Sequence, residues 1–133
     1  MLQVVAGIIE LDGFVLLCRR RANERRFPRK WEFPGGKVED DESPEAAIDR
    51  ELREELGIRV KTKKPYARYT FQYDGELPFE LIFFTILDHD HTIQNLQFES
   101  MAWVLREKLN SYDLLEGDKP LVRMLQEIDP DKR

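Results

Sequence analysis

Apolar runs and turn residues divide the chain into short strands. Residues 2–11 are almost all apolar, which predicts a strand buried on both faces. Asp12-Gly13 predicts a two-residue hairpin turn because both residues tolerate positive φ, and residues 14–18 would be the returning strand. Further strands are expected at 31–33, 58–63, 66–73, 79–88 and 101–104.

Residues 44–56 carry the clearest helical pattern. Ser43 suits the N-cap and Pro44 suits the first helical position, while Gly57 suits the left-handed C-cap. The apolar stripe of this helix, with positions four apart, consists of Ile48, Leu52 and Leu56. The pattern therefore predicts an amphipathic helix that packs one face on a sheet.

A second helix is expected near the C-terminus, with Asp118 as a possible cap and Pro120 near its start. Its inward face would consist of Leu121, Leu125 and Ile128. Residues 88–91 (DHDH) predict a plain turn, because they lack the spacing of zinc ligands. The order of strands and helices predicts an α+β fold, with helices on a mixed sheet, in a single domain spanning residues 1–133.

Composition and charge narrow the function classes. Hydrophobic residues make up 41% and charged residues 35% of the chain, as in ordinary globular domains. The net charge of −5 disfavours nucleic acid and anionic membrane as partners. Cys18 is the one cysteine, which excludes an intrachain disulfide and favours a cytoplasmic protein with a buried, inert thiol. No signal peptide or membrane span is expected.

The first helix carries a group of acidic residues. Glu51, Glu54 and Glu55 share one face at i, i+3 and i+4, and Arg50 can pair with Glu54. Three neighbouring carboxylates repel each other, and a hard dication such as Mg²⁺ relieves that repulsion. A solvated acidic face is the alternative. Gly35-Gly36 predicts a flexible turn whose backbone carbonyls can approach a metal or phosphate closely.

The spacing around these residues resembles the Nudix box. The matching positions are Gly36, then five residues, Glu42, then seven residues, and RELREELGI at 50–58. This resemblance implies the Nudix fold, an α/β/α sandwich with a mixed sheet between helices. It also implies hydrolysis of a nucleoside diphosphate linked to another moiety, with Mg²⁺ as the cofactor and Mn²⁺ as a possible substitute.

The same resemblance implies roles for individual residues. The metal ligands would be the Gly35 carbonyl and the carboxylates of Glu51, Glu54 and Glu55. Glu51 or Glu54 would accept the proton of the attacking water, with Arg50 completing the catalytic group.

Other positions of the box would support this arrangement. Glu42 and Arg50 would brace the loop and the helix, and Gly36 and Gly57 would allow the backbone geometry. Lys37 would neutralise substrate phosphate.

Beyond the box, WEFPGGKVE at 31–39 and the segment around Trp103 resemble the MutT-like branch, in particular the small CTP or oxidised-nucleotide pyrophosphohydrolases. A nucleoside triphosphate, CTP/dCTP-like or 8-oxo-dGTP-like, would give the monophosphate and pyrophosphate, in a nucleotide-pool sanitising role. A late-loop glutamate common in that branch is replaced by Gln97, and Glu99 is a candidate substitute.

Four positions are candidates for substrate binding. Arg20 corresponds to a phosphate-contacting arginine of MutT-like enzymes, while the rest of the basic segment 19–30 is expected to be a solvated loop. Lys37 would also face phosphate, and Phe33 could stack on the base. Asp118, as an acceptor, would favour donor-rich base edges such as the cytosine amino group or the guanine N1/N2 edge; its alternative role is only to cap the helix.

Two other functions stay open. The substrate could be a nucleotide sugar, ADP-ribose or a dinucleoside polyphosphate, although residues 73–76 (YDGE) lack the clear subfamily markers. A nucleotide sensor that does not cleave is the second alternative, disfavoured by the intact box. The partner is expected to be a small-molecule nucleotide, bound by a monomer or a homodimer.

Overall fold

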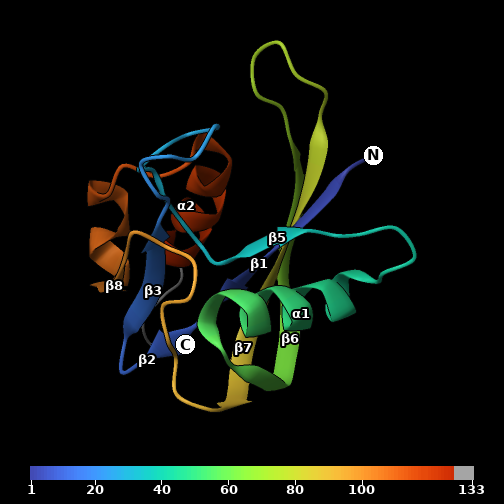
Figure 1. The fold of residues 1–133 in the computed structure, drawn as a ribbon. Helices are drawn as coiled ribbons and strands as arrows, with labels where there is room; N and C mark the ends of the chain where they lie inside the picture. The colour runs from blue at the N-terminus through green and yellow to red at the C-terminus, as the bar shows by residue number, and fades with distance from the viewer. Residues whose placement is uncertain (128–133) are drawn as a thin grey trace.

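The computed structural model describes residues 1–127, and the expected inward position of Ile128 lies outside them. One sheet is mixed: β1 pairs parallel with β7, whereas β5 pairs with β1 and β6 pairs with β7 antiparallel. Its strands, in spatial order, are β5 (Gly35–Lys37), β1 (Gln3–Ile8), β7 (Phe79–Asp90) and β6 (Arg59–Phe71). Figure 1 shows the β6–β7 hairpin projecting beyond the rest of the sheet.

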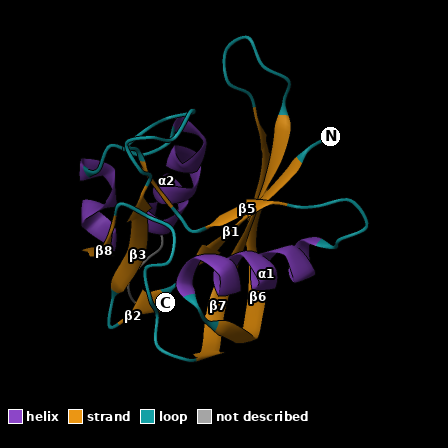
Figure 2. Ribbon diagram, in the orientation of Figure 1, coloured by secondary structure: helices purple, strands orange, loops and turns teal. Residues whose placement is uncertain are grey.

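A second, antiparallel sheet is built around β3. Its strands are β2 (Glu10–Leu11), β3 (Phe14–Arg19), β4 (Trp31–Glu32) and β8 (Ser100–Leu105). The helical elements are α1 (Pro44–Leu56), α2 (Lys119–Glu127) and the 3₁₀ turns η1 (Arg106–Ser111) and η2 (Glu116–Asp118). Figure 2 shows α1 lying across the first sheet and α2 beside the second. No helix within residues 1–127 is long and apolar enough to span a bilayer.

Two hydrophobic cores flank β1. Val5 packs in the core that contains Ile48 and Leu52 of α1, whereas Ala6 and Ile8 pack in the core that contains Leu121 of α2. Successive strand residues point to opposite faces, so a strand covered on both sides must be apolar throughout. This arrangement confirms the α/β/α sandwich and the doubly buried first strand.

The predicted strand 2–11 is wrong in its continuity. β1 ends at Ile8, and after Ile9 the chain enters the second sheet as β2. The Ile9 carbonyl accepts a hydrogen bond from Leu16 N–H at 3.0 Å, which begins the pairing with β3. The apolar run continues through Ile8 and Ile9, which are both buried, so it gives no signal for this change of sheet, although Leu11 of β2 is exposed.

Three other boundaries also differ. The strands expected at 58–63 and 66–73 are one strand, β6, which tolerates Pro65 because it lies at the sheet edge and pairs irregularly there. Residues 89 and 90 extend β7 beyond its predicted end at residue 88, so the turn predicted at 88–91 reduces to the region of His91. Gly35-Gly36 is not a flexible turn but part of β5, held by β1.

The ends of α1 agree with the sequence prediction. Ser43 Oγ accepts a hydrogen bond from Ala46 N–H at 3.1 Å, and Pro44 occupies the first turn. Gly57 has φ 69° and donates its N–H to the Arg53 carbonyl. These caps fix where the helix starts and stops, and therefore which way its glutamates face.

Candidate functional site

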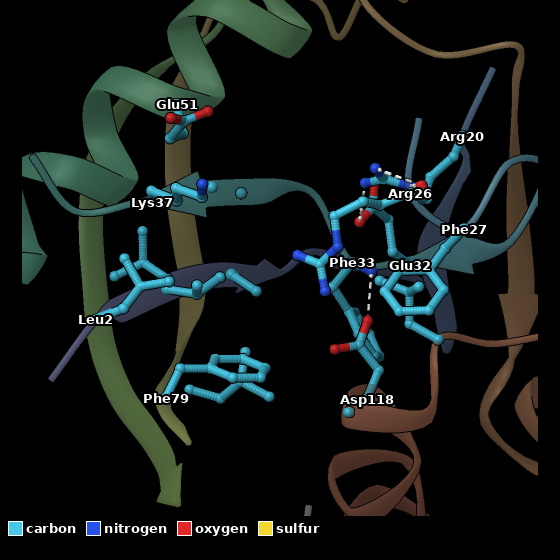
Figure 3. Close-up of a pocket in the computed structure, with 18 of the residues that line it drawn as sticks. Leu2, Arg20, Arg26, Phe27, Glu32, Phe33, Lys37, Glu51, Phe79 and Asp118 are labelled. Atoms are coloured by element: carbon cyan, nitrogen blue, oxygen red, sulfur yellow. Dashed lines mark hydrogen bonds and ion pairs between the residues drawn. The ribbon is translucent and has the colours of Figure 1, made fainter. Parts of the chain in front are cut away.

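A cavity of about 930 Å³ is lined by residues of both sheets, α1, the loop after β3 and the tip of the β6–β7 hairpin. Figure 3 shows Glu51 and Lys37 on one side of this pocket, and Arg20, Glu32 and Asp118 on the other. The pocket is large enough for a nucleotide, and each end carries charged groups of its own.

At one end, α1 presents acidic side chains to β5. Glu51 and Glu55 line the pocket, whereas Glu54 is not among its lining residues and has 55% of its side chain exposed. A Cβ on Gly36 would lie 2.5 Å from the carboxyl carbon of Glu51, so any side chain at this position would have to displace that carboxyl group. The Gly35 N–H donates to Glu55 Oε1 at 2.9 Å, which ties the strand to the helix.

Arg50 organises the acidic group. Its Nε and Nη2 donate to the two oxygens of Glu42 at 2.8 and 2.9 Å. Its Nη1 donates to Glu51 at 2.9 Å and to Glu54 at 3.4 Å, so the predicted Arg50–Glu54 pair is present. A single guanidinium therefore bridges the helix, the preceding loop and the carbonyl of Lys37, to which Nη2 donates at 3.0 Å.

The pKa values of these carboxyl groups are shifted by burial and by their neighbouring charges. Burial, with the negative charges of Glu51 and Glu32, raises the pKa of Glu55 to about 9. Burial also raises the pKa of Glu51, although Arg50 opposes this change. Hydrogen bonds from Arg50 and from the Glu39 backbone lower the pKa of Glu42 to about 2. Packing acidic groups together is costly unless a cation neutralises them.

The chemistry of this end fits a divalent ion. Among residues 1–127, no three acidic, histidine or cysteine side chains converge closely enough to hold an ion as they stand. Arg50 Nη1 is instead the cation that Glu51 and Glu54 share. Carboxylate and carbonyl oxygens are the ligands that Mg²⁺ and other hard dications prefer, and a dication would neutralise the negative charges that, together with burial, raise the pKa of Glu55.

The other end of the pocket is formed where the segment before α2 meets β4. The N–H of Leu115 donates to the Trp31 carbonyl, and the N–H of Trp31 donates to the Asp113 carbonyl, both at 2.9 Å. These bonds bring Asp118, 5% exposed, beside Phe33, whose N–H donates to Asp118 Oδ2 at 3.2 Å. The carboxylate bonds to this distant backbone group instead of capping the first turn of α2.

Glu32 is a pocket carboxylate that the sequence prediction missed. Arg20 Nη1 lies 3.3 Å from both of its oxygens. Burial raises the pKa of Glu32 to about 7, against the opposing effect of Arg20. Burial and the charge of Glu32 raise the pKa of Asp118 to about 8. An acidic residue between two aromatic residues, Trp31 and Phe33, was the one available signal.

The predicted phosphate contact Arg20 lines the pocket, but its guanidinium is directed at acidic and carbonyl oxygens of the chain. It pairs with Glu32 and with Glu24 at 3.4 Å, and it donates to the Arg26 carbonyl at 3.0 Å. The basic segment is therefore less free than a solvated loop. Other ion pairs of this segment join Arg26 to Glu76, Lys30 to Asp113, and Arg19 and Arg29 to Glu99.

The late loop brings Gln97 and Phe98 to the pocket. Glu99 is not among the lining residues, because Arg19 and Arg29 engage it at 3.4 and 3.8 Å. Gln97 is therefore the late-loop side chain placed to contribute an oxygen.

Aromatic side chains form the remaining wall. Phe33 is 3% exposed and packs edge-on against Phe83, with ring centroids 5.9 Å apart. Phe27, from the basic loop, contacts Tyr73 at a centroid distance of 4.7 Å. Phe79 stacks on Tyr73 at 5.9 Å and also lines the pocket.

An α/β/α sandwich with clustered glutamates at one end of its pocket defines a pyrophosphohydrolase of the Nudix type, a class that uses divalent metals. The chain belongs to this family, because the NUDIX domain model matches residues 1–125.

Individual relatives agree with this assignment. The CTP pyrophosphohydrolase of Escherichia coli (strain K12) is 38% identical over 122 residues, covering 92% of this chain and 89% of that protein. Nucleoside triphosphatase NudI of Enterobacter sp. (strain 638) is 36% identical over 128 residues, covering 87% and 90%. The solution structure of the E. coli ORF135 protein superposes with a TM-score of 0.83 at 37% identity, covering 98% and 94%.

Proposed function

We propose that this protein hydrolyses a nucleoside triphosphate to the monophosphate and pyrophosphate, with Mg²⁺ as its metal. The observation that carries the proposal is a single pocket with a glutamate cluster at one end and a pair of carboxyls, the half-buried Glu32 and the buried Asp118, at the other. The relatives named as CTP pyrophosphohydrolase and nucleoside triphosphatase support this substrate class.

The metal would be held by the carboxylates of Glu51, Glu54 and Glu55 and by the Gly35 carbonyl. When bound, Mg²⁺ supplies charge neutralisation for phosphate oxygens and a more acidic water, and Mn²⁺ can do the same. Arg50 donates hydrogen bonds to both Glu51 and Glu54 and so holds their carboxyl groups near each other. Lys37 lines the pocket and adds positive charge there. Positioning and charge neutralisation are the main requirements of phosphoryl transfer.

The proton of the attacking water would pass to a carboxylate of α1. Glu51 is the first candidate, with Glu54 as the second, since burial raises the pKa of Glu51 toward the operating range of a general base. Gly36 keeps this side chain close to β5, because any larger residue would displace its carboxyl group.

The base would bind between the aromatic wall and the Glu32–Asp118 pair. Carboxyl oxygens accept hydrogen bonds, and a base edge that donates N–H groups to them would favour their ionised forms, so the pair would select the cytosine amino group or the N1/N2 edge of guanine and its oxidised forms. Phe33 N–H already occupies Asp118 Oδ2, which leaves Oδ1 as the oxygen for the base. We therefore propose a CTP-like or oxidised-dGTP-like nucleotide as the substrate.

A substrate panel with wild type and Glu54→Gln tests the proposal. Wild type should release pyrophosphate from at least one nucleoside triphosphate in Mg²⁺, and the variant should be slower by about 10²-fold or more. Glu45→Gln, on the exposed first turn of the same helix, is the matched control. Equal turnover by wild type and Glu54→Gln would remove Glu54 from the mechanism, and release of a nucleoside monophosphate only from diphosphate-linked sugars would change the substrate class.

A further inference from the structure

Two tyrosine hydroxyls hold the backbone of the residue that precedes Asp118. Tyr69 Oη donates to the Gly117 carbonyl at 2.6 Å, and the Gly117 N–H donates to Tyr73 Oη at 3.1 Å. Both tyrosines come from the β6 side of the hairpin, and they are separated from Gly117 by more than forty residues of sequence. The hairpin therefore binds η2 at a single residue, Gly117, through both its N–H and its carbonyl group.

The bonded carbonyl of Gly117 belongs to the peptide group that joins Gly117 to Asp118. Fixing that peptide plane restricts the backbone of Asp118, from which the carboxyl side chain projects. Two further bonds complete the restriction, because Asp118 N–H donates to the Leu115 carbonyl at 3.0 Å and Asp118 Oδ2 accepts from Phe33. The direction of Oδ1 is thus determined by contacts outside Asp118 itself.

Gly117 is suited to this contact because it lacks a side chain. A Cβ there would lie 3.1 Å from Tyr73 Oη and 3.3 Å from Leu81 Cδ1, which is tighter than ordinary packing. Glycine lets η2 lie directly on the hairpin, within reach of both hydroxyls.

We propose that Tyr69 and Tyr73 are positioning residues for base selection, which act through Gly117 on Asp118. This inference rests on the proposed function, in which Asp118 meets the base. Tyr73 also contacts Phe27 of the basic loop, so the same residue connects that loop with the base end of the pocket. The hydroxyls of Tyr69 and Tyr73 bond to Gly117 and so position Asp118, which is the group that would bond to the base edge. The ring of Tyr73 also lines the pocket, and Tyr73→Phe keeps that ring.

Tyr69→Phe and Tyr73→Phe test the proposal, because each removes one hydroxyl and keeps the ring contacts. Loss of one neutral hydrogen bond should reduce discrimination between the best and the worst nucleoside triphosphate by about three- to tenfold. The change should appear as a higher KM for the preferred nucleotide, with kcat within about twofold. Tyr66→Phe is the control, since Tyr66 lies on β6 like Tyr69 but is not one of the two tyrosines whose hydroxyls bond to Gly117.

A double-variant cycle separates positioning from a structural effect. In an Asp118→Ala background, Tyr69→Phe and Tyr73→Phe should cause no further loss of discrimination, because the group they position is gone. An unchanged base ranking in both single variants, with only a lower Tm, would overturn the proposal. The proposal would also be overturned if the loss of discrimination caused by each tyrosine variant simply added to the loss caused by Asp118→Ala.

Binding of nucleosides without phosphate or metal keeps this test distinct from the proposed activity. Calorimetry on wild type, Tyr69→Phe, Tyr73→Phe and Tyr66→Phe should show weaker, less selective binding only in the first two variants. If wild type cleaves no nucleoside triphosphate, the proposed function fails while nucleoside selectivity still decides the role of the tyrosines. If wild type binds all nucleosides equally, the positioning proposal fails even when hydrolysis is observed.

Discussion

Arg50 and Glu42 form a two-point ion pair, with Nε to Oε2 at 2.8 Å and Nη2 to Oε1 at 2.9 Å. Both side chains are about five-sixths covered, with 16% and 15% exposed. The pair fastens the middle of α1 to the loop that precedes it. Because Arg50 Nη1 also reaches Glu51 and Glu54, the position of the acidic cluster depends on this loop contact.

Arg50→Lys should weaken the enzyme without unfolding it. Lysine keeps the positive charge but cannot reproduce the planar fork that binds Glu42 and reaches Glu51 at the same time. Partners that orient metal ligands typically contribute about 10- to 100-fold to metal affinity or activity, so we expect a loss of that size. The measurement is kcat as a function of Mg²⁺ concentration. Arg53 is exposed on the same helix, and Arg53→Lys should behave like wild type. If Arg50→Lys showed the same dependence of kcat on Mg²⁺ as Arg53→Lys, the role of Arg50 would be contradicted.

Gly36→Ala should impair turnover through steric displacement. The added Cβ would lie 2.5 Å from the Glu51 carboxyl carbon and 2.6 Å from both of its oxygens. We expect kcat to fall by at least about tenfold, the scale of a misplaced catalytic group. Gly13→Ala is the control: its φ of +85° makes alanine strained, but nothing lies within 4 Å. Loss of stability without loss of kcat is the result expected there, and the same result for Gly36→Ala would refute the steric argument.

The sequence predicted those parts of the molecule whose signals are local. The caps at Ser43 and Gly57 and the helical spacing of the glutamates depend on neighbouring residues, and α1 therefore matched its prediction. The change of sheet after Ile8 was missed, because the apolar run continues through the buried Ile8 and Ile9 without a turn residue. Pairing between strands that are far apart in the chain leaves no periodic pattern in the sequence.

The base end of the pocket shows the same limit. Asp118 was singled out, but its bond to Phe33 spans 85 residues and no local pattern encodes it. Glu32 was passed over because it lies in a short strand between aromatic residues. Its neighbours Arg20 and Asp118 come from other segments, so only the fold shows that a carboxyl here is buried in a pocket.

Asp118→Ala and Glu32→Gln should each flatten the preference among nucleotides. Asp118→Ala removes an acceptor, and Glu32→Gln replaces an acidic group with a neutral amide that both donates and accepts. Turnover of a poor substrate should stay nearly intact, because neither residue lies among the glutamates of α1. The measurement is kcat/KM across cytosine, guanine, adenine and uracil triphosphates and their oxidised forms. An unchanged ranking in both variants would assign base selection to another part of the pocket.

Asp118 should also make folding stability depend on pH. Burial raises its pKa from the ordinary value of 3.8 to about 8, so between these values the folded protein binds more protons than the unfolded chain. The free energy of unfolding therefore falls as pH rises through this window, by at most about 1.4 kcal/mol per pH unit for one group. Glu32, raised from 4.5 to about 7, adds the same sign over a narrower range.

Asp118→Asn should remove the contribution of this carboxyl and flatten the curve. The neutral amide can be buried without taking up a proton. The free energy of unfolding of the variant, measured relative to that of wild type, should therefore be higher at pH 8 than at pH 5. Urea unfolding from pH 5 to 9 measures the effect, with Asp113→Asn, whose side chain is 72% exposed, as the control. Parallel curves for wild type and Asp118→Asn would show that the buried carboxyl is already ionised across this range.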